Sequence, residues 1–143
     1  MSIFNSIKDV MDHLNGLETL SKLVAENYAL EGGIANRIAE KKGNMKFTQI
    51  RKFFGHIKKI EKTIKDKEDN EPIDMEELYL LMPELAYGYG REVISKDFYD
   101  VMKICIATNK IKKVIDFKRF VELLSAVIAY HKKIEMDNKG GGK

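Results

Sequence analysis

The sequence has few of the residues that break or crosslink a chain, and it has no long apolar run. Only two prolines, Pro72 and Pro83, occur among 143 residues, so long segments are free to be helical. The single cysteine, Cys105, cannot form an internal disulfide, and we expect it to be a small buried hydrophobic residue. No stretch of about 18 apolar residues exists, and charged side chains at positions 8–12 come too early for a signal-peptide core. We therefore expect a cytoplasmic protein that does not enter a membrane.

The motifs that usually mark catalysis or metal binding are also missing. The three histidines, at positions 13, 56 and 131, lie in separate segments without the close spacing of a zinc site. The glycines of GYGRE (88–92) do not follow the pattern of a phosphate-binding loop. No Ser/His/Asp set and no pair of carboxylates stands out. We therefore expect no catalytic residues, no metal and no cofactor, and we expect that the protein is not an enzyme.

Charge is abundant and is divided into blocks along the chain. The net charge is −3 over residues 1–40, +8 over 41–67, −8 over 68–100 and +6 over 101–143, which gives the total of +3. Basic blocks of this kind favour a polyanionic partner. The blocks could equally neutralise each other within the fold or between copies of the chain, or form solvated helix faces, and these alternatives stay open.

Apolar residues recur every three or four positions in the long segments, which is typical of helices. We find no strand-like alternation of useful length. The sequence predicts an all-α fold, a compact helical bundle of about five to six helices, as a single domain over residues 1–136 with a flexible tail at 137–143. Helical periodicity covers residues 2–14, 16–30, 34–43, 47–67, 74–87, 96–110 and 117–136.

Several residues predict where these helices begin and end. Ser95 and Asp116 can cap the two helices that follow them. We expect Pro83 to kink or divide the segment 74–87, because an internal proline removes one helical hydrogen bond. The segment 88–92 reads as a turn.

The segment 47–67, FTQIRKFFGHIKKIEKTIKDK, is apolar on one side and basic on the other. On a helical wheel its apolar residues fall within an arc of about 120°. This predicts a core face made of Ile50, Phe53, Phe54, Ile57, Ile60 and Ile64. Because the aromatic residues point towards the core, contact with a phosphate backbone is a better prediction than base stacking.

The basic side of this helix carries two rows of cations. Arg51, Lys58 and Lys62 form one row, Lys52 and Lys59 form a second, and Gly55 lies between them. Like charges at such spacing repel and destabilise an isolated helix, so a partner anion is a natural reason for the rows. Gly55 either lets a bulky anion approach the main chain or is simply tolerated on an exposed face.

The last helix, 117–136, has the widest apolar arc and should be the most buried. Its apolar positions predict a packed or surface role for His131 rather than a catalytic one. Lys118 and Arg119 lie near its start, where a cation is unfavourable for the helix dipole. They therefore imply either a partner or an acidic neighbour.

Three segments, in this order, resemble a known family. They are FTQIRKFFGHIKKI, LLMPELAYGYGR and FKRFVELLSAVIAYHKK, which together span roughly residues 45–135. The sequence is similar here to the small helical subunit of type III-A CRISPR effector complexes, the Csm small subunit. Residues 1–44 carry no such signature.

The resemblance implies that several copies line the duplex of guide RNA and target RNA as an inner filament. In that family the small subunit contacts the RNA backbone and neighbouring subunits, while other subunits cut RNA. Base pairing then reads the sequence, and the protein reads shape and charge. The resemblance also adds Arg91 to the site, and an ion pair with Glu84 or Glu92 is its alternative role. The matching segments include Gln49 as well. Gln49 lies about 160° from Arg51 on the helical wheel and is therefore left out of the site.

From the sequence we thus expect a non-catalytic subunit of a type III-A CRISPR RNA-guided interference complex. Its expected partners are the backbones of guide and target RNA, other subunits and copies of itself. The alternative is a helical scaffold that self-associates through its acidic and basic blocks without direct RNA contact. The expected RNA-binding residues are Arg51, Lys52, Lys58, Lys59, Lys62, Arg91, Lys118 and Arg119.

Overall fold

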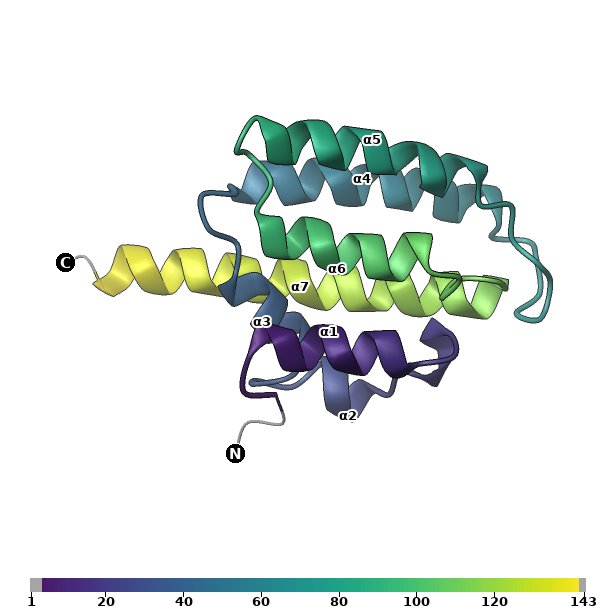
Figure 1. Cartoon of the computed structure of the whole chain (residues 1–143), viewed down its shortest axis with the longest axis horizontal. Helices are drawn as coiled ribbons and strands as arrows, with labels where there is room; N and C mark the ends of the chain where they lie inside the picture. The colour runs from purple at the N-terminus through teal and green to yellow at the C-terminus, as the bar shows by residue number, and fades with distance from the viewer. Residues whose placement is uncertain (1–3, 142–143) are drawn as a thin grey trace.

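Helices make up nearly all of the regular structure of the protein (Figure 1). The computed structural model describes residues 4–141, and within that range it contains no β-strand. The elements are α1 (Ile7–Gly16), the 3-10 helix η1 (Leu20–Lys22), α2 (Ala25–Tyr28), α3 (Ile34–Glu40), α4 (Phe47–Thr63), α5 (Glu76–Gly90), α6 (Lys96–Ala107) and α7 (Val114–Gly141). The predicted all-α bundle is confirmed, with slightly more helices than the five to six expected.

Helix α7 runs through the middle of the bundle. It contacts α3 and η1 on one side and α4 on the other, and α6 links α5 to α1. Figure 1 shows α4 and α5 along one edge of the molecule, α6 and α7 in the middle, and α1 to α3 along the opposite edge. The C-terminal part of α7 extends beyond the other helices. The long last helix therefore holds the two edges together.

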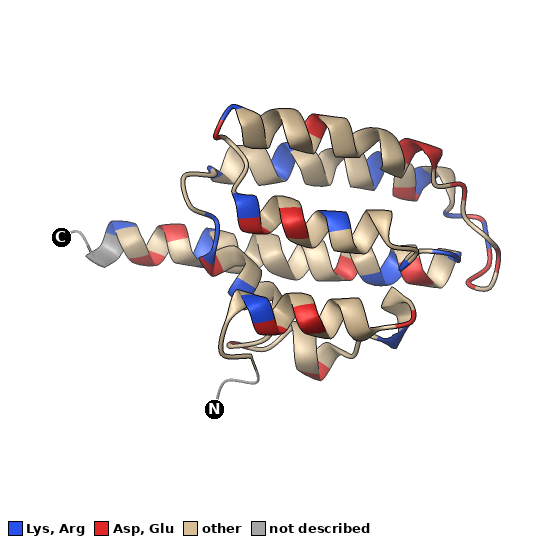
Figure 2. Cartoon of the chain, in the orientation of Figure 1, with Lys and Arg blue, Asp and Glu red and all other residues tan. Residues whose placement is uncertain are grey.

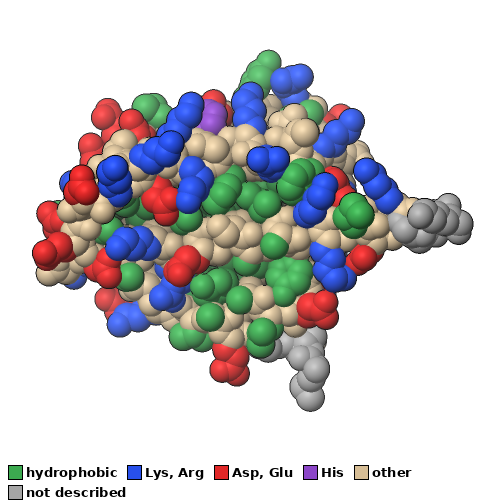
Figure 3. Space-filling model, turned by 180° about the vertical axis from the view of Figure 1, so that it is seen from behind, with side chains coloured by type: hydrophobic (Ala, Val, Ile, Leu, Met, Phe, Trp, Pro, Cys, Tyr) green, Lys and Arg blue, Asp and Glu red, His purple; other side chains and the backbone are tan. Residues whose placement is uncertain are grey.

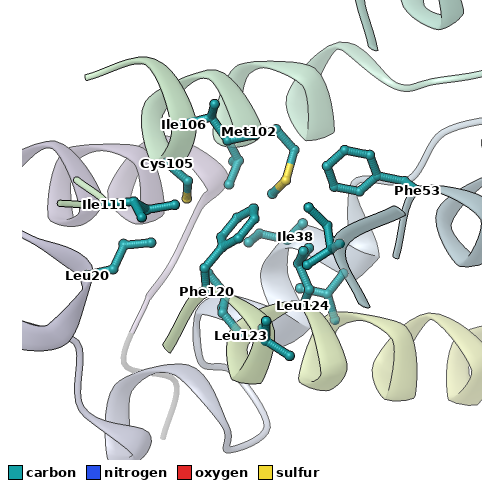
Figure 4. Close-up of a cluster of buried hydrophobic side chains, with 14 of the residues drawn as sticks. Leu20, Ile38, Phe53, Met102, Cys105, Ile106, Ile111, Phe120, Leu123 and Leu124 are labelled. Carbon is teal, nitrogen blue, oxygen red and sulfur yellow. The ribbon is translucent and has the colours of Figure 1, made fainter. Parts of the chain in front are cut away.

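The core is formed where α3, α4, α6 and α7 meet around Phe120. Phe120 is completely buried, as are Met102 and Cys105 of α6 (Figure 4). Burial raises the pKa of the Cys105 thiol to about 12, because a thiolate is poorly stabilised away from water. Cys105 is thus the buried hydrophobic residue that the sequence predicted. The expected burial of the last helix is confirmed at Phe117, Phe120, Val121, Leu123, Leu124, Val127 and His131, while Ile128 and Tyr130 are half-buried.

The segment 16–30 is not the single helix that its periodicity predicts. It contains only η1 and the one-turn helix α2, joined by extended residues. Contacts with a distant part of the chain explain the difference. The N–H of Leu20 donates to the carbonyl of Lys110 at 2.9 Å, and the N–H of Ser21 donates to Asp116 at 3.0 Å. Tertiary hydrogen bonds therefore replace the helical ones here.

Helix α5 contradicts the predicted turn, because it includes Gly88 and Gly90. Of the two effects expected from Pro83, division of the segment does not occur, since the helix continues through that residue. Pro83 and Tyr79 both lie on the exposed side, where water can satisfy the Tyr79 carbonyl that loses its helical donor. Gly88 serves packing instead of a turn, since a Cβ atom there would approach Cγ1 of Ile94 to 2.5 Å.

Of the two predicted caps, only Ser95 directly precedes its helix, whereas Asp116 lies inside the first turn of α7. Ser95 accepts a hydrogen bond from the N–H of Phe98 at 3.1 Å at the start of α6. Helix α7 begins at Val114, earlier than predicted, and Asp116 accepts hydrogen bonds from Lys112 and Lys113 at 3.0 Å each. Burial alone would raise the pKa of Asp116, but these backbone hydrogen bonds outweigh it and hold the pKa below its ordinary value.

The division into a domain over residues 1–136 and a flexible tail over 137–143 stays a proposal. Residues 137–141 of the proposed tail form the end of α7. Residues 1–3 and 142–143 lie outside the described part of the chain. No helix within residues 4–141 has the length and apolarity needed to cross a membrane. The same residues contain no group of three or more His, Cys, Asp or Glu side chains that could hold a metal ion.

Candidate nucleic-acid interface

Helix α4 turns its apolar side inwards and its cations outwards. Ile50, Phe53, Ile57 and Ile60 are buried, and so is Ile64 directly after the helix. Only Phe54 of the predicted core face is half-buried. The opposite side exposes Arg51, Lys52, Lys58, Lys59 and Lys62. Figure 3 shows Lys and Arg side chains gathered over the part of the surface where α4 lies. The two-sided character that the sequence predicts for this helix is therefore confirmed.

The start of α4 is held by the far end of α7. The N–H of Phe47 donates to the Glu135 carboxylate at 3.2 Å, and the Phe47 ring stacks on the His131 ring with centroids 5.7 Å apart. The Arg51 guanidinium and the Lys132 ammonium lie 5.7 and 5.0 Å from the centre of the same ring. These cation–π contacts orient the first cation of the basic face.

His131 is a packing residue in this junction. Its side chain is fully buried, its Nε2 lies 3.3 Å from the Met45 carbonyl, and its Nδ1 has no hydrogen-bond partner in the described chain. Burial lowers the pKa of His131, because the charged imidazolium is poorly stabilised there. A histidine enclosed in this way has no access to a substrate, as the sequence analysis expected.

Most cations of the α4 face have no acidic partner within the described residues 4–141. Lys58 is the exception, since it forms an ion pair with Glu61 at 2.5 Å and lies 5.9 Å from the centre of the Phe54 ring. Within residues 4–141, no carboxylate oxygen lies within 4.0 Å of the remaining cations of this face, which are Arg51, Lys52, Lys59 and Lys62. The face therefore carries a positive charge that the fold itself does not compensate.

Gly55 lies between the two rows of cations, on the exposed surface. A Cβ atom at this position would meet no atom within 4 Å. Packing therefore does not require glycine here, and its effect is to leave a gap in the side-chain layer between the rows.

Lys118 and Arg119 are arranged differently from the α4 cations. Lys118 pairs with Asp69 at 2.5 Å, and Arg119 pairs with Glu122 at 3.0 Å. Figure 2 shows that acidic residues gather around the loop before α5, which includes Asp69, and on the first turn of that helix. Acidic neighbours thus account for both cations near the start of α7, which was one of the two explanations considered.

A groove of about 490 Å³ lies between α4 and α5. Lys52 lines it from α4, and Arg91, directly after α5, lines it from the other side. The Arg91 guanidinium lies 5.5 Å from the centre of the Tyr87 ring. The expected alternative, an ion pair with Glu84 or Glu92, is not formed, and Glu84 instead faces His56 at 3.6 Å. Arg91 is therefore as free of carboxylate partners as Lys52 is.

The lining residues that were not predicted as site residues include Gln49 and Tyr87. Gln49 was left out because of its angle to Arg51, yet it lies one turn before Lys52, and a wheel centred on Lys52 would have included it. Tyr87 belongs to a helix that follows α4 only after a loop, so periodicity carries no signal for its position. The structure brings Lys52, Arg91, Gln49 and Tyr87 together.

A comparison with protein families identifies the family of the chain. The family model described as Csm2 Type III-A matches residues 25–137, which is most of the chain and includes residues 25–44, where no signature was recognised. No curated protein and no solved structure matches the chain. The chain therefore belongs to the Csm2 Type III-A family and is a small subunit of type III-A CRISPR Csm complexes.

Proposed function

We propose that this subunit is non-catalytic and binds the backbones of guide and target RNA without sequence preference, in the cytoplasm. The observation that carries the proposal is the exposed face of α4, where Arg51, Lys52, Lys59 and Lys62 have no carboxylate partner in the described part of the chain. Phosphate contacts position a protein on RNA but carry no sequence information. A guide-programmed complex has to accept any target, so contacts of this kind suit it.

The geometry of α4 supports contact with a backbone. The distance along the axis from Arg51 to Lys62 is about 16 Å at about 1.5 Å per residue, long enough to follow several phosphates. Phe53 is buried, and the half-buried rings of Phe47 and Phe54 lie close to cations of this face. This helix thus offers RNA charge and little aromatic surface.

We further propose that the subunit packs against other subunits of the complex and against copies of itself. The first half of α5 exposes Tyr79, which is 49% exposed, and Leu80, which is 63% exposed, next to Glu76 and Glu77. Large apolar side chains with acidic neighbours suit a protein contact better than a contact with RNA.

The salt dependence of RNA binding tests the proposal. Five cations without acidic partners, four on α4 and Arg91, give a slope of log K against log salt of about −3.5 on single-stranded RNA, if each neutralises one phosphate. Affinity should then fall about a hundredfold between 50 and 200 mM salt. Similar affinity for two unrelated sequences is expected, and tight, sequence-selective binding by a verified monomer would contradict the proposal.

The second candidate is a scaffold that assembles through its acidic and basic blocks without touching RNA. The acidic cluster before α5 favours it, because this cluster could meet the α4 face of another copy (Figure 2). Light scattering at the same two salt concentrations separates the candidates. Self-association that disappears at high salt, together with no RNA binding at low salt, supports the scaffold.

A further inference from the structure

The groove between α4 and α5 has a composition that a backbone-binding surface does not require. It combines two cations, Lys52 and Arg91, with an exposed aromatic ring, Tyr87, and a side-chain amide, Gln49. Its volume of about 490 Å³ falls within the range of small-molecule sites, about 300–1,000 Å³. Buried Phe53 and Leu85 contribute apolar lining. Phosphate-binding, ring-stacking and hydrogen-bonding groups thus meet in one place.

The Tyr87 ring is the unusual element. It is 68% exposed, the most exposed large hydrophobic side chain in the described part of the chain. Arg91 lies against it at 5.5 Å, which helps to orient the ring beside a positive charge. Aromatic rings stack with every base, because each base has a π face. A ring held beside Arg91, in a groove that Lys52 also lines, is therefore suited to an unstacked base whose flanking phosphates the two cations bind.

Gln49 and the pair of His56 and Glu84 complete the arrangement. The Gln49 amide has no hydrogen-bond partner in the described structure, and an amide both donates and accepts, so it can pair with the edge of any base. Glu84 is the only carboxylate among the lining residues, and His56 lies across from it at 3.6 Å. The negative charge of Glu84 disfavours a phosphate nearby. A phosphate is therefore expected at Lys52 and Arg91.

We propose that this groove binds one unstacked nucleotide of single-stranded RNA, with its base on Tyr87 and its phosphates at Lys52 and Arg91. The inference rests on the proposed RNA binding and extends it, because it adds a base contact that does not depend on sequence. A nucleotide of this kind has to be unpaired, so the groove distinguishes single-stranded segments from a continuous duplex. The α4 rows, by contrast, can contact either form.

The test compares two oligonucleotides with the same number of phosphates, one a normal RNA and one with abasic residues. Fluorescence anisotropy measures their affinity for the full chain and for Tyr87→Ala, Tyr87→Phe and Tyr89→Ala. Because stacking on one aromatic residue contributes about 1–3 kcal/mol per base, Tyr87→Ala should weaken binding of normal RNA about 5- to 150-fold. It should leave binding of the abasic oligonucleotide unchanged.

The other variants are matched controls. Tyr87→Phe keeps the ring and should bind both oligonucleotides like the unmodified chain. Tyr89→Ala removes an exposed tyrosine from the same helix outside the groove and should have no effect. Melting curves of all three should be similar, because both tyrosines are exposed. A loss of RNA affinity in Tyr89→Ala equal to that in Tyr87→Ala overturns the assignment of the groove.

The outcomes also separate this inference from the proposed function. If the chain binds both oligonucleotides equally and Tyr87→Ala changes neither, backbone binding stands and the nucleotide site is wrong. If the chain binds neither, both proposals are wrong. If Tyr87→Ala reduces self-association in light scattering without affecting RNA, the ring belongs to a protein interface. Displacement of the RNA by micromolar nucleoside monophosphate would mean that the groove takes a free nucleotide, which also overturns the inference.

Discussion

Replacing Arg51, Lys58 and Lys62 by alanine tests the first row of cations on α4. If each side chain neutralises one phosphate, the salt slope on single-stranded RNA should become flatter by about 2, at about 0.7 per phosphate. Lys58 has to break its ion pair with Glu61 to reach RNA, so its contribution to the salt slope can be absent. In that case the other two residues still account for a change of about 1.4.

The same variant should fold normally, because all three side chains are exposed. Removing Lys58 and Lys62 relieves a like-charge pair four residues apart, worth about 0.2–0.5 kcal/mol, and removing Lys58 also breaks an ion pair of similar size. Loss of the Arg51 contact with Phe47 costs about 0.5–1 kcal/mol at an exposed site. The first two effects cancel, which leaves a net loss of about 0.5–1 kcal/mol, so the melting temperature should fall by no more than about 4 °C.

The assay is fluorescence anisotropy with single-stranded RNA at several salt concentrations, accompanied by melting curves. A variant with Lys22, Lys103 and Lys112 replaced by alanine removes the same charge from exposed positions outside α4 and should keep the original slope. An unchanged slope in the α4 variant, with an unchanged melting curve, would mean that this row is only a solvated helix face. Equal changes in both variants would point to net charge alone.

Three further predictions concern stability. Phe120→Ala should lower the free energy of unfolding by about 3–5 kcal/mol, because Phe120 is completely buried; an unchanged urea midpoint combined with lost RNA binding would contradict this. Gly55→Ala should raise the free energy of unfolding by about 1 kcal/mol, since the added methyl group meets no atom within 4 Å, and a lower urea midpoint would argue against this placement. The pKa of His131 is lower in the folded chain than its unfolded value of about 6.5. The unfolded chain therefore binds the proton more strongly, so the stability contributed by neutral His131 is present above pH 6.5 or so and is lost as the pH falls through the folded pKa. Urea midpoints should be measured at about pH 7.5 and about pH 5.5, on either side of the ordinary histidine pKa. They should differ less in His131→Gln than in the unmodified chain.

The sequence was most informative where one helix sets its own pattern. The core side of α4 and its two rows of cations follow from spacing alone, because residues three and four apart share a face. The burial of Phe120 in α7 follows in the same way. Local caps such as Ser95 were also predictable, since the cap and the N–H it accepts from are three residues apart.

The errors come from contacts that helical periodicity does not reveal. Gly88 looked like a turn residue, but its missing Cβ makes room for Ile94 while the helix continues. Leu20 lies in a helical pattern, yet its N–H bonds to Lys110 far along the chain. The groove escaped prediction for the same reason, because Lys52 and Tyr87 lie on different helices whose separation in space is set by the whole bundle.

The junction at Phe47 affects how deletions of the C-terminal region should be interpreted. Glu135 accepts the hydrogen bond from the first N–H of α4, and His131 supports the ring on which Arg51 is placed. Shortening the chain before residue 131 would therefore remove a cap, a stacked ring and the orientation of a cation from another helix. A truncated protein that no longer binds RNA would report on the integrity of α4 and not on contacts made by the deleted residues.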